Sequence, residues 1–89
     1  MVTFIVLINV KRGTVVTTAE QLVDLDCVSE VYSVTGQYDL VALVRTHSND
    51  EVAQLVTSQL SAIEGIEKTD TMLAFDTYSK HDLEAMFSI

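Results

Sequence analysis

The chain has 89 residues, enough for one small domain, and its formal net charge is −8. Apolar residues make up 48% of it and the mean hydropathy is +0.31, which excludes an intrinsically disordered segment. The five basic residues are scattered rather than clustered, so we expect no direct contact with nucleic acid.

A strand is expected at the start of the chain, over residues 2–10. Apolar side chains alternate along both of its faces, with Phe4, Val6 and Ile8 on one and Ile5 and Leu7 on the other. The segment is too short for a helix that crosses a bilayer, and no secretory cleavage site follows it. We therefore expect a soluble, cytoplasmic protein without membrane contact.

A helix is expected next, ending near Leu25. Thr17 and Glu20 have the spacing of a capping box, although a start one turn earlier is an alternative. The apolar residues at helical spacing predict one buried face, formed by Val16, Ala19, Leu22 and Val23.

Two strands joined by a tight turn are expected after this helix. The first covers residues 28–35 and has mixed polarity, whereas the second covers residues 39–45 and is continuously apolar from Leu40 to Val44. Only two residues separate Gly36 from Asp39, a spacing that suits a tight hairpin.

The rest of the chain predicts a second helix, a fourth strand and a tail. Ser48 and Glu51 form a capping signal, Gly65 ends the helix, and the strand covers residues 66–77. We expect residues 1–78 to form the domain and residues 79–89 a tail with an apolar stripe at helical spacing. The apolar residues of the helix are Val52, Leu55, Val56, Leu60 and Ile63, and those of the tail stripe are Leu83, Met86 and Phe87.

The order of these elements predicts an α+β fold of the ferredoxin-like βαββαβ type, with the first and third strands at the centre of an antiparallel sheet. Two helices cover only one face of such a sheet. Ile5, Leu7 and alternate residues of the third strand would then face water, and an apolar patch of that size is typical of an interface. We expect a sheet-to-sheet homodimer of the dimeric α/β barrel type that assembles further.

The segment from Val28 to Val41 resembles the signature of the Lrp/AsnC effector domain, the RAM domain. That pattern is a valine opening the second strand, then Thr-Gly, two variable residues, Asp and an apolar strand, and the match includes Thr35, Gly36 and Asp39. Residues 66–71 resemble the family's Thr-x-Thr strand. The family's regulators carry an N-terminal helix-turn-helix region; the chain resembles stand-alone members without it, or an effector domain excised at an introduced Met1.

The resemblance implies a site for an amino acid in a cleft between dimers, with no cofactor and no metal. It places Gly36, Gln37, Tyr38 and Asp39 in that cleft, with the hydroxyls of Thr69 and Thr71 coming from a neighbouring subunit. A glycine turn exposes backbone N–H groups for a carboxylate, and Asp39 suits an ammonium group. In the alternative interpretation Asp39 only bonds turn amides and the threonines only favour a strand.

No other residues form a recognisable site. Cys27 is the single cysteine, which excludes an internal disulfide, and we expect it to be a buried structural thiol. His47 and His81 have no partners at catalytic spacing. Four acidic residues match no calcium loop and are expected to be solvated, namely Glu20, Asp24, Asp26 and Glu30.

Three functions are compatible with this sequence. The first is a non-catalytic amino-acid sensor that changes its own assembly or its pairing with a full-length Lrp/AsnC regulator. The second is a small monooxygenase or isomerase on the same dimeric fold, which needs a deep pocket lined by a residue such as Tyr32 or His47. The third is a purely structural oligomerisation module.

Overall fold

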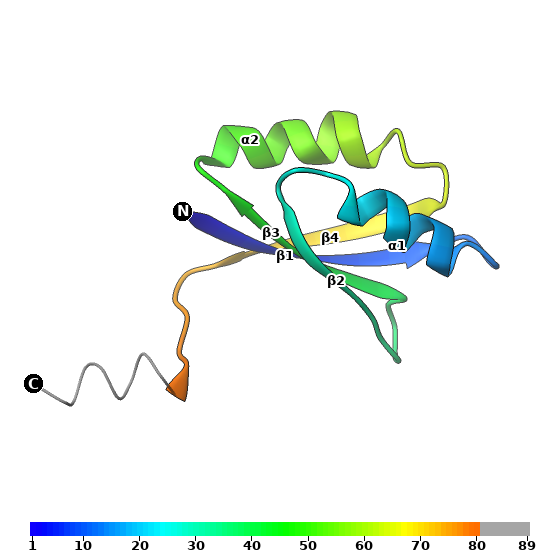
Figure 1. Ribbon diagram of the computed structural model, residues 1–89, viewed down its shortest axis with the longest axis horizontal. Helices are drawn as coiled ribbons and strands as arrows, with labels where there is room; N and C mark the ends of the chain where they lie inside the picture. The colour runs from blue at the N-terminus through cyan, green and yellow to red at the C-terminus, as the bar shows by residue number, and fades with distance from the viewer. Residues whose placement is uncertain (81–89) are drawn as a thin grey trace, which may run out of the picture.

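Two helices lie on one face of a four-stranded antiparallel sheet in the computed structural model, which describes residues 1–80 (Figure 1). The strand order β2-β3-β1-β4 confirms the expected ferredoxin-like α+β fold, with the first and third strands at the centre. The elements are β1 (Val2–Val10), α1 (Val15–Val23), β2 (Val28–Ser33), β3 (Leu40–Thr46), α2 (Asn49–Gln54), the π-helical segment η1 (Leu55–Leu60) and β4 (Ile66–Ala74).

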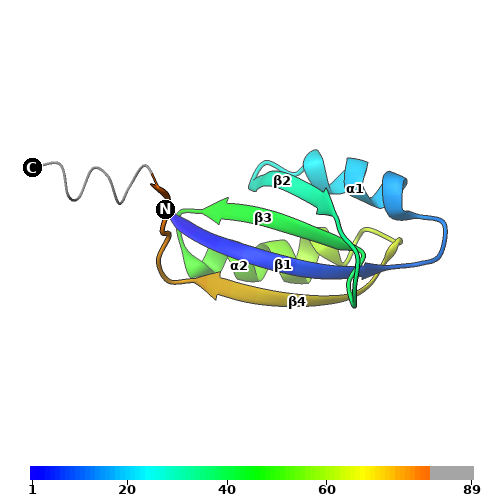
Figure 2. The ribbon, with the colours of Figure 1, turned by 90° about the horizontal axis from the view of Figure 1, so that it is seen from below.

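The two central strands divide their apolar side chains between the faces of the sheet. Their buried residues lie on the helix side, and these are Phe4, Val6, Ile8, Val10, Leu40, Ala42 and Val44. No helix among residues 1–80 covers the other side, as Figure 2 shows from below. We call this second side the open face, and the register places on it the apolar side chains of Ile5, Leu7, Tyr32, Val41, Leu43 and Met72.

Helix α1 begins one turn before the Thr17–Glu20 signal, which confirms the alternative start, and its buried face differs from the expectation. It begins at Val15 after Thr14, so Thr17 and Glu20 lie within the helix and form no capping box. Val16 and Val23 are 69% and 55% exposed, so the expected face was wrong in these two residues. The residues that α1 turns toward the core are Val15, Thr18, Ala19 and Leu22.

The second helix begins as expected and changes its type halfway. Ser48 is the N-cap and its hydroxyl accepts from the Glu51 N–H, while the Glu51 carboxylate accepts from the His47 N–H. The hydroxyls of Thr57 in η1 and of Ser61, its C-cap, donate to the carbonyls four residues before them. Hydroxyl bonds of this kind slightly weaken and bend helices, and η1 ends at Leu60.

Three strand ends differ from the expectation by one to three residues. Strand β2 ends at Ser33, β3 continues to Thr46, and β4 ends at Ala74 rather than at Thr77. The expected apolar stripe of the tail, Leu83 to Phe87, and His81 lie outside the described residues.

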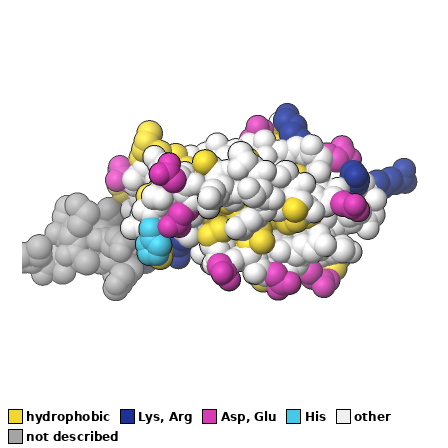
Figure 3. Space-filling model, turned by 90° about the horizontal axis from the view of Figure 1, so that it is seen from above, with side chains coloured by type: hydrophobic (Ala, Val, Ile, Leu, Met, Phe, Trp, Pro, Cys, Tyr) yellow, Lys and Arg dark blue, Asp and Glu magenta, His cyan; other side chains and the backbone are white. Residues whose placement is uncertain are grey.

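The helix side carries scattered acidic side chains with apolar ones between them (Figure 3). Among the described residues, no helix is both long enough and apolar enough to cross a membrane.

Candidate functional site

The β2–β3 loop contains the four candidate residues from Gly36 to Asp39. A hydrogen bond from the Val34 N–H to the Asp39 carbonyl, 3.1 Å long, closes the loop around four residues, so the expected two-residue turn was wrong. Gly36 has a φ of +114°, a conformation that residues with a Cβ rarely adopt. The glycine is therefore required by the shape of the loop itself.

Asp39 is fixed at the end of the loop by its neighbour β1. Its backbone N–H donates to the Ile8 carbonyl over 2.9 Å, and its carboxylate Oδ2 accepts from the Val10 N–H over 2.8 Å. The carboxylate thus bonds an amide of the adjacent strand and not an amide of its own turn. A carboxylate accepts several hydrogen bonds, so Asp39 retains capacity for a ligand donor.

Asn9 holds the tip of the loop, and sequence reasoning did not select it. Its side-chain amide donates to the Gln37 carbonyl over 2.8 Å, while the Gln37 side chain is exposed. The available signal was a polar residue near the end of an otherwise apolar strand.

Tyr38 reaches across β1 to β4, where its hydroxyl donates to the Asp70 carboxylate. Asp70 pairs with Leu7 in the sheet, which places this contact on the open face. The hydrogen bond to Asp70, with smaller contributions from burial and from the charge of Asp70, raises the pKa of Tyr38 above its ordinary value. Asp70 was also missed by sequence reasoning, although it lies between the two candidate threonines.

Thr69 and Thr71 do not join the loop within one protomer. They pair with Ile8 and Val6, whose side chains lie on the helix side, so both threonines face away from Asp70. Thr69 lines a cleft of about 290 Å³ between η1 and β4, and Thr71 is exposed. The structure therefore brings four of the six candidates together and separates the other two by the thickness of the sheet.

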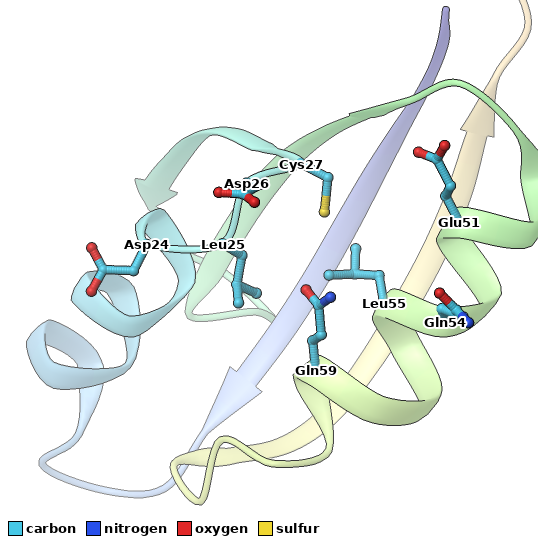
Figure 4. Close-up of a pocket in the computed structure, with 8 residues that line it drawn as sticks. All are labelled: Asp24, Leu25, Asp26, Cys27, Glu51, Gln54, Leu55 and Gln59. Atoms are coloured by element: carbon cyan, nitrogen blue, oxygen red, sulfur yellow. The ribbon is translucent and has the colours of Figure 1, made fainter.

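A second cleft, of about 340 Å³, lies between the α1–β2 connection and the second helix (Figure 4). Burial is the main cause that raises the pKa of the Cys27 thiol in it, and the charges of Asp26 and Glu51 act in the same direction. A raised pKa makes the thiol a poor nucleophile at neutral pH. The lining residues are Asp24, Leu25, Asp26, Cys27, Glu51, Gln54, Leu55 and Gln59.

Metal binding, and catalysis by Tyr32 or His47, are the other functions to consider for the described part of the chain. Residues 1–80 contain no group of His, Cys, Asp and Glu side chains that could hold a metal ion. Tyr32 is 47% exposed and donates a hydrogen bond to Glu30, and His47 is exposed. Neither residue lines the clefts described above or the shallow one beside α1 that includes Val23 and Val31.

The sequence matches a known protein family and several proteins that resemble it. The family model for the Lrp/AsnC ligand-binding domain matches residues 3–83. The HTH-type transcriptional regulator FL11 of Pyrococcus abyssi is 36% identical over 75 residues, which are 84% of this chain and 49% of that protein. The chain thus spans about half the length of the curated relatives it matches.

Solved structures with a similar fold also resemble this chain. TTHA0845 from Thermus thermophilus is 45% identical, with a TM-score of 0.83 over 90% of this chain and 100% of that one. The transcriptional regulator NMB0573 of Neisseria meningitidis, solved as a complex with L-Met, has a TM-score of 0.80 over 88% of this chain and 52% of that one. At 10% identity, the second likeness shows the fold alone.

Proposed function

The chain belongs to the family of Lrp/AsnC ligand-binding domains, and on this premise we propose that it is a non-catalytic sensor that binds a small amino acid between subunits. Binding changes the assembly of the domain or its pairing with a full-length regulator of the family. Through that pairing it contributes to transcription regulation in the cytoplasm. The HTH-type regulators among its relatives support the regulatory part of this proposal.

The observation that carries the proposal is the anchored β2–β3 loop. Bonds to Asn9, Val10 and Asp70 hold it from two neighbouring strands, so its backbone N–H groups and the Asp39 carboxylate are positioned before any ligand arrives. Such preorganisation reduces the entropy that binding costs. A free amino acid offers the matching groups, an ammonium for Asp39 and a carboxylate for the N–H groups near Gly36.

The division of the candidates between two sides of the sheet supports a site formed by more than one chain. Thr69 and Thr71 do not reach the loop of their own protomer, so their hydroxyls serve a loop that a neighbouring subunit brings to the helix side of β4. The structure of the Neisseria meningitidis regulator with L-Met supports a free amino acid as the class of ligand for this fold.

The open face supports a sheet-to-sheet homodimer as the unit of this assembly. Its apolar side chains lie in the middle of the sheet and at its edges, with no element of the described chain over them. A second sheet packed about 10 Å away would remove them from water. Further association of dimers then creates the clefts between subunits.

The test is calorimetric titration of the protein with each of the twenty amino acids, followed by titration of variants with the one that binds. Asp39→Asn keeps an oxygen for the Val10 N–H but loses the charge, so we expect affinity at least about tenfold weaker. Glu20→Gln, an exposed change on α1, is the control and should bind as the unchanged protein does. Absence of heat at millimolar concentrations for all twenty would refute amino-acid sensing.

The specific bond from Val10 to Asp39 also favours a second candidate, a structural oligomerisation module. In that case the carboxylate serves the fold alone. The same titrations separate the two functions, because a purely structural module gives no binding heat with any amino acid.

A further inference from the structure

Residues 75–80, which we call the C-terminal arm, follow β4 and leave the body of the domain. Residues 75–79 form neither helix nor strand, and the arm descends on the side of the open face (Figure 1). Two large side chains on it are almost fully solvated, since Phe75 is 89% exposed and Tyr78 is 78% exposed. Exposed aromatic residues on an extended segment are typical of a contact with another chain.

We propose that the arm of each protomer packs against the sheet of a second copy, with Phe75 and Tyr78 as its anchors. This inference rests on the sheet-to-sheet dimer of the proposed function. The anchors contact the rim of the partner's open face, where the half-exposed side chains of Tyr32 on β2 and Met72 on β4 lie. Aromatic pairs and contacts between thioether and ring are favourable at such a rim.

The length of the arm fits this contact. The five residues 75–79 span up to about 17 Å when extended, and two sheets that pack face to face are about 10 Å apart. Because the arm leaves β4 toward the open side, it enters the space that a second sheet would occupy. An arm that left β4 on the helix side would not enter that space.

The area of the open face gives an independent reason for the arm. Four strands about 4.8 Å apart and about 25 Å long make a footprint of roughly 500 Å². A stable interface usually buries about 800 Å² on each partner. The two aromatic side chains bury about 150–250 Å² each when covered, so sheet and arm together reach that value.

The test compares two double variants of the full chain. Phe75→Ser with Tyr78→Ser removes both anchors. Val16→Ser with Val23→Ser is the matched control, since those side chains are 69% and 55% exposed on α1, on the opposite side of the sheet. Sedimentation equilibrium over a dilution series gives the dissociation constant of the dimer for each protein.

We expect the arm variant to dissociate at a concentration about tenfold higher or more, and the control to remain within about twofold of the unchanged chain. An unchanged dissociation constant for the arm variant would overturn the inference and leave the sheet dimer intact. If the unchanged chain is monomeric at every concentration, the dimer of the proposed function fails, and the inference fails with it.

A second measurement does not depend on weakening the dimer. The chain contains no tryptophan, so Tyr78→Trp introduces a single reporter at the anchor. Its emission should shift to the blue at concentrations where the dimer forms and return to the red on dilution. Emission typical of a solvated indole at all concentrations would contradict the arm contact.

Discussion

Gly65, the residue before β4, packs so closely against α1 that no side chain fits. A Cβ at this position would overlap Thr18 Oγ1 and lie 3.0 Å from Thr14 Oγ1, and Thr18 is only 1% exposed. We expect Gly65→Ala to lower the free energy of unfolding by about 1–3 kcal/mol, measured by urea denaturation at one fixed chain concentration.

The same substitution in a Thr18→Ala background provides the control. Removing the hydroxyl removes the main overlap, so the cost of Gly65→Ala should fall well below its cost in the unchanged chain. An equal cost in both backgrounds would show that the contact with Thr18 is not the cause.

The hydrogen bond between Tyr38 and Asp70 gives a prediction for alkaline pH. Because the pKa of Tyr38 is raised in the folded protein, this bond stabilises the fold below the ordinary tyrosine pKa of about 10 and is lost as the pH rises through the raised value. The difference between the absorbance titrations of the unchanged chain and Tyr38→Phe should show a midpoint above 10. A midpoint at or below that of a model tyrosine would contradict the contact.

At this scale the sequence identified the residues of the loop but not those that hold it. Gly36 and Asp39 stand in a recognisable local pattern. Asn9 and Asp70 are 28 and 32 residues from their partners in the loop, and only the pairing of β1 with β3 and with β4 brings them near. Sequence spacing carries no direct signal for such contacts.

The strands were easier to predict from the sequence than the buried face of α1, and the reason is physical. Polarity separated central from edge strands because each strand shows its environment along its whole length. Helix α1 is short, so the spacing of its apolar residues does not define a single buried face. Thr18 lies in the core because Gly65, which has no side chain, leaves room for it. A buried threonine and two exposed valines are the reverse of what hydropathy predicts.

The two capping signals in the sequence therefore make opposite predictions. Ser48 caps α2, so Ser48→Ala should lower the free energy of unfolding by about 1 kcal/mol. Thr17 lies exposed within α1, so Thr17→Ala should leave stability unchanged or raise it by a few tenths of a kcal/mol, since alanine favours helices. Thermal or urea denaturation of both variants checks this, and equal losses would contradict the assigned helix starts.

At the scale of the whole molecule, a net charge of −8 accompanies an apolar sheet face that no element of residues 1–80 covers. Two such copies repel each other over distances comparable to the Debye length, which falls from about 10 Å at 0.1 M salt to about 3 Å at 1 M. Burial of the open face favours the dimer and opposes this repulsion. When salt screens the repulsion, the contribution of burial dominates more strongly. Charge and sheet together thus make the dimer sensitive to ionic strength.

We expect the dissociation constant of the dimer to fall several-fold between 0.1 M and 1 M sodium chloride, measured by sedimentation equilibrium. Glu20→Gln with Asp24→Asn removes two negative charges from α1 and its end, far from the open face, and should make this dependence shallower. A dissociation constant that rises with salt would contradict the prediction. It would mean that ion pairs between protomers, formed by Arg45 or Lys68 of the open face, outweigh the net repulsion.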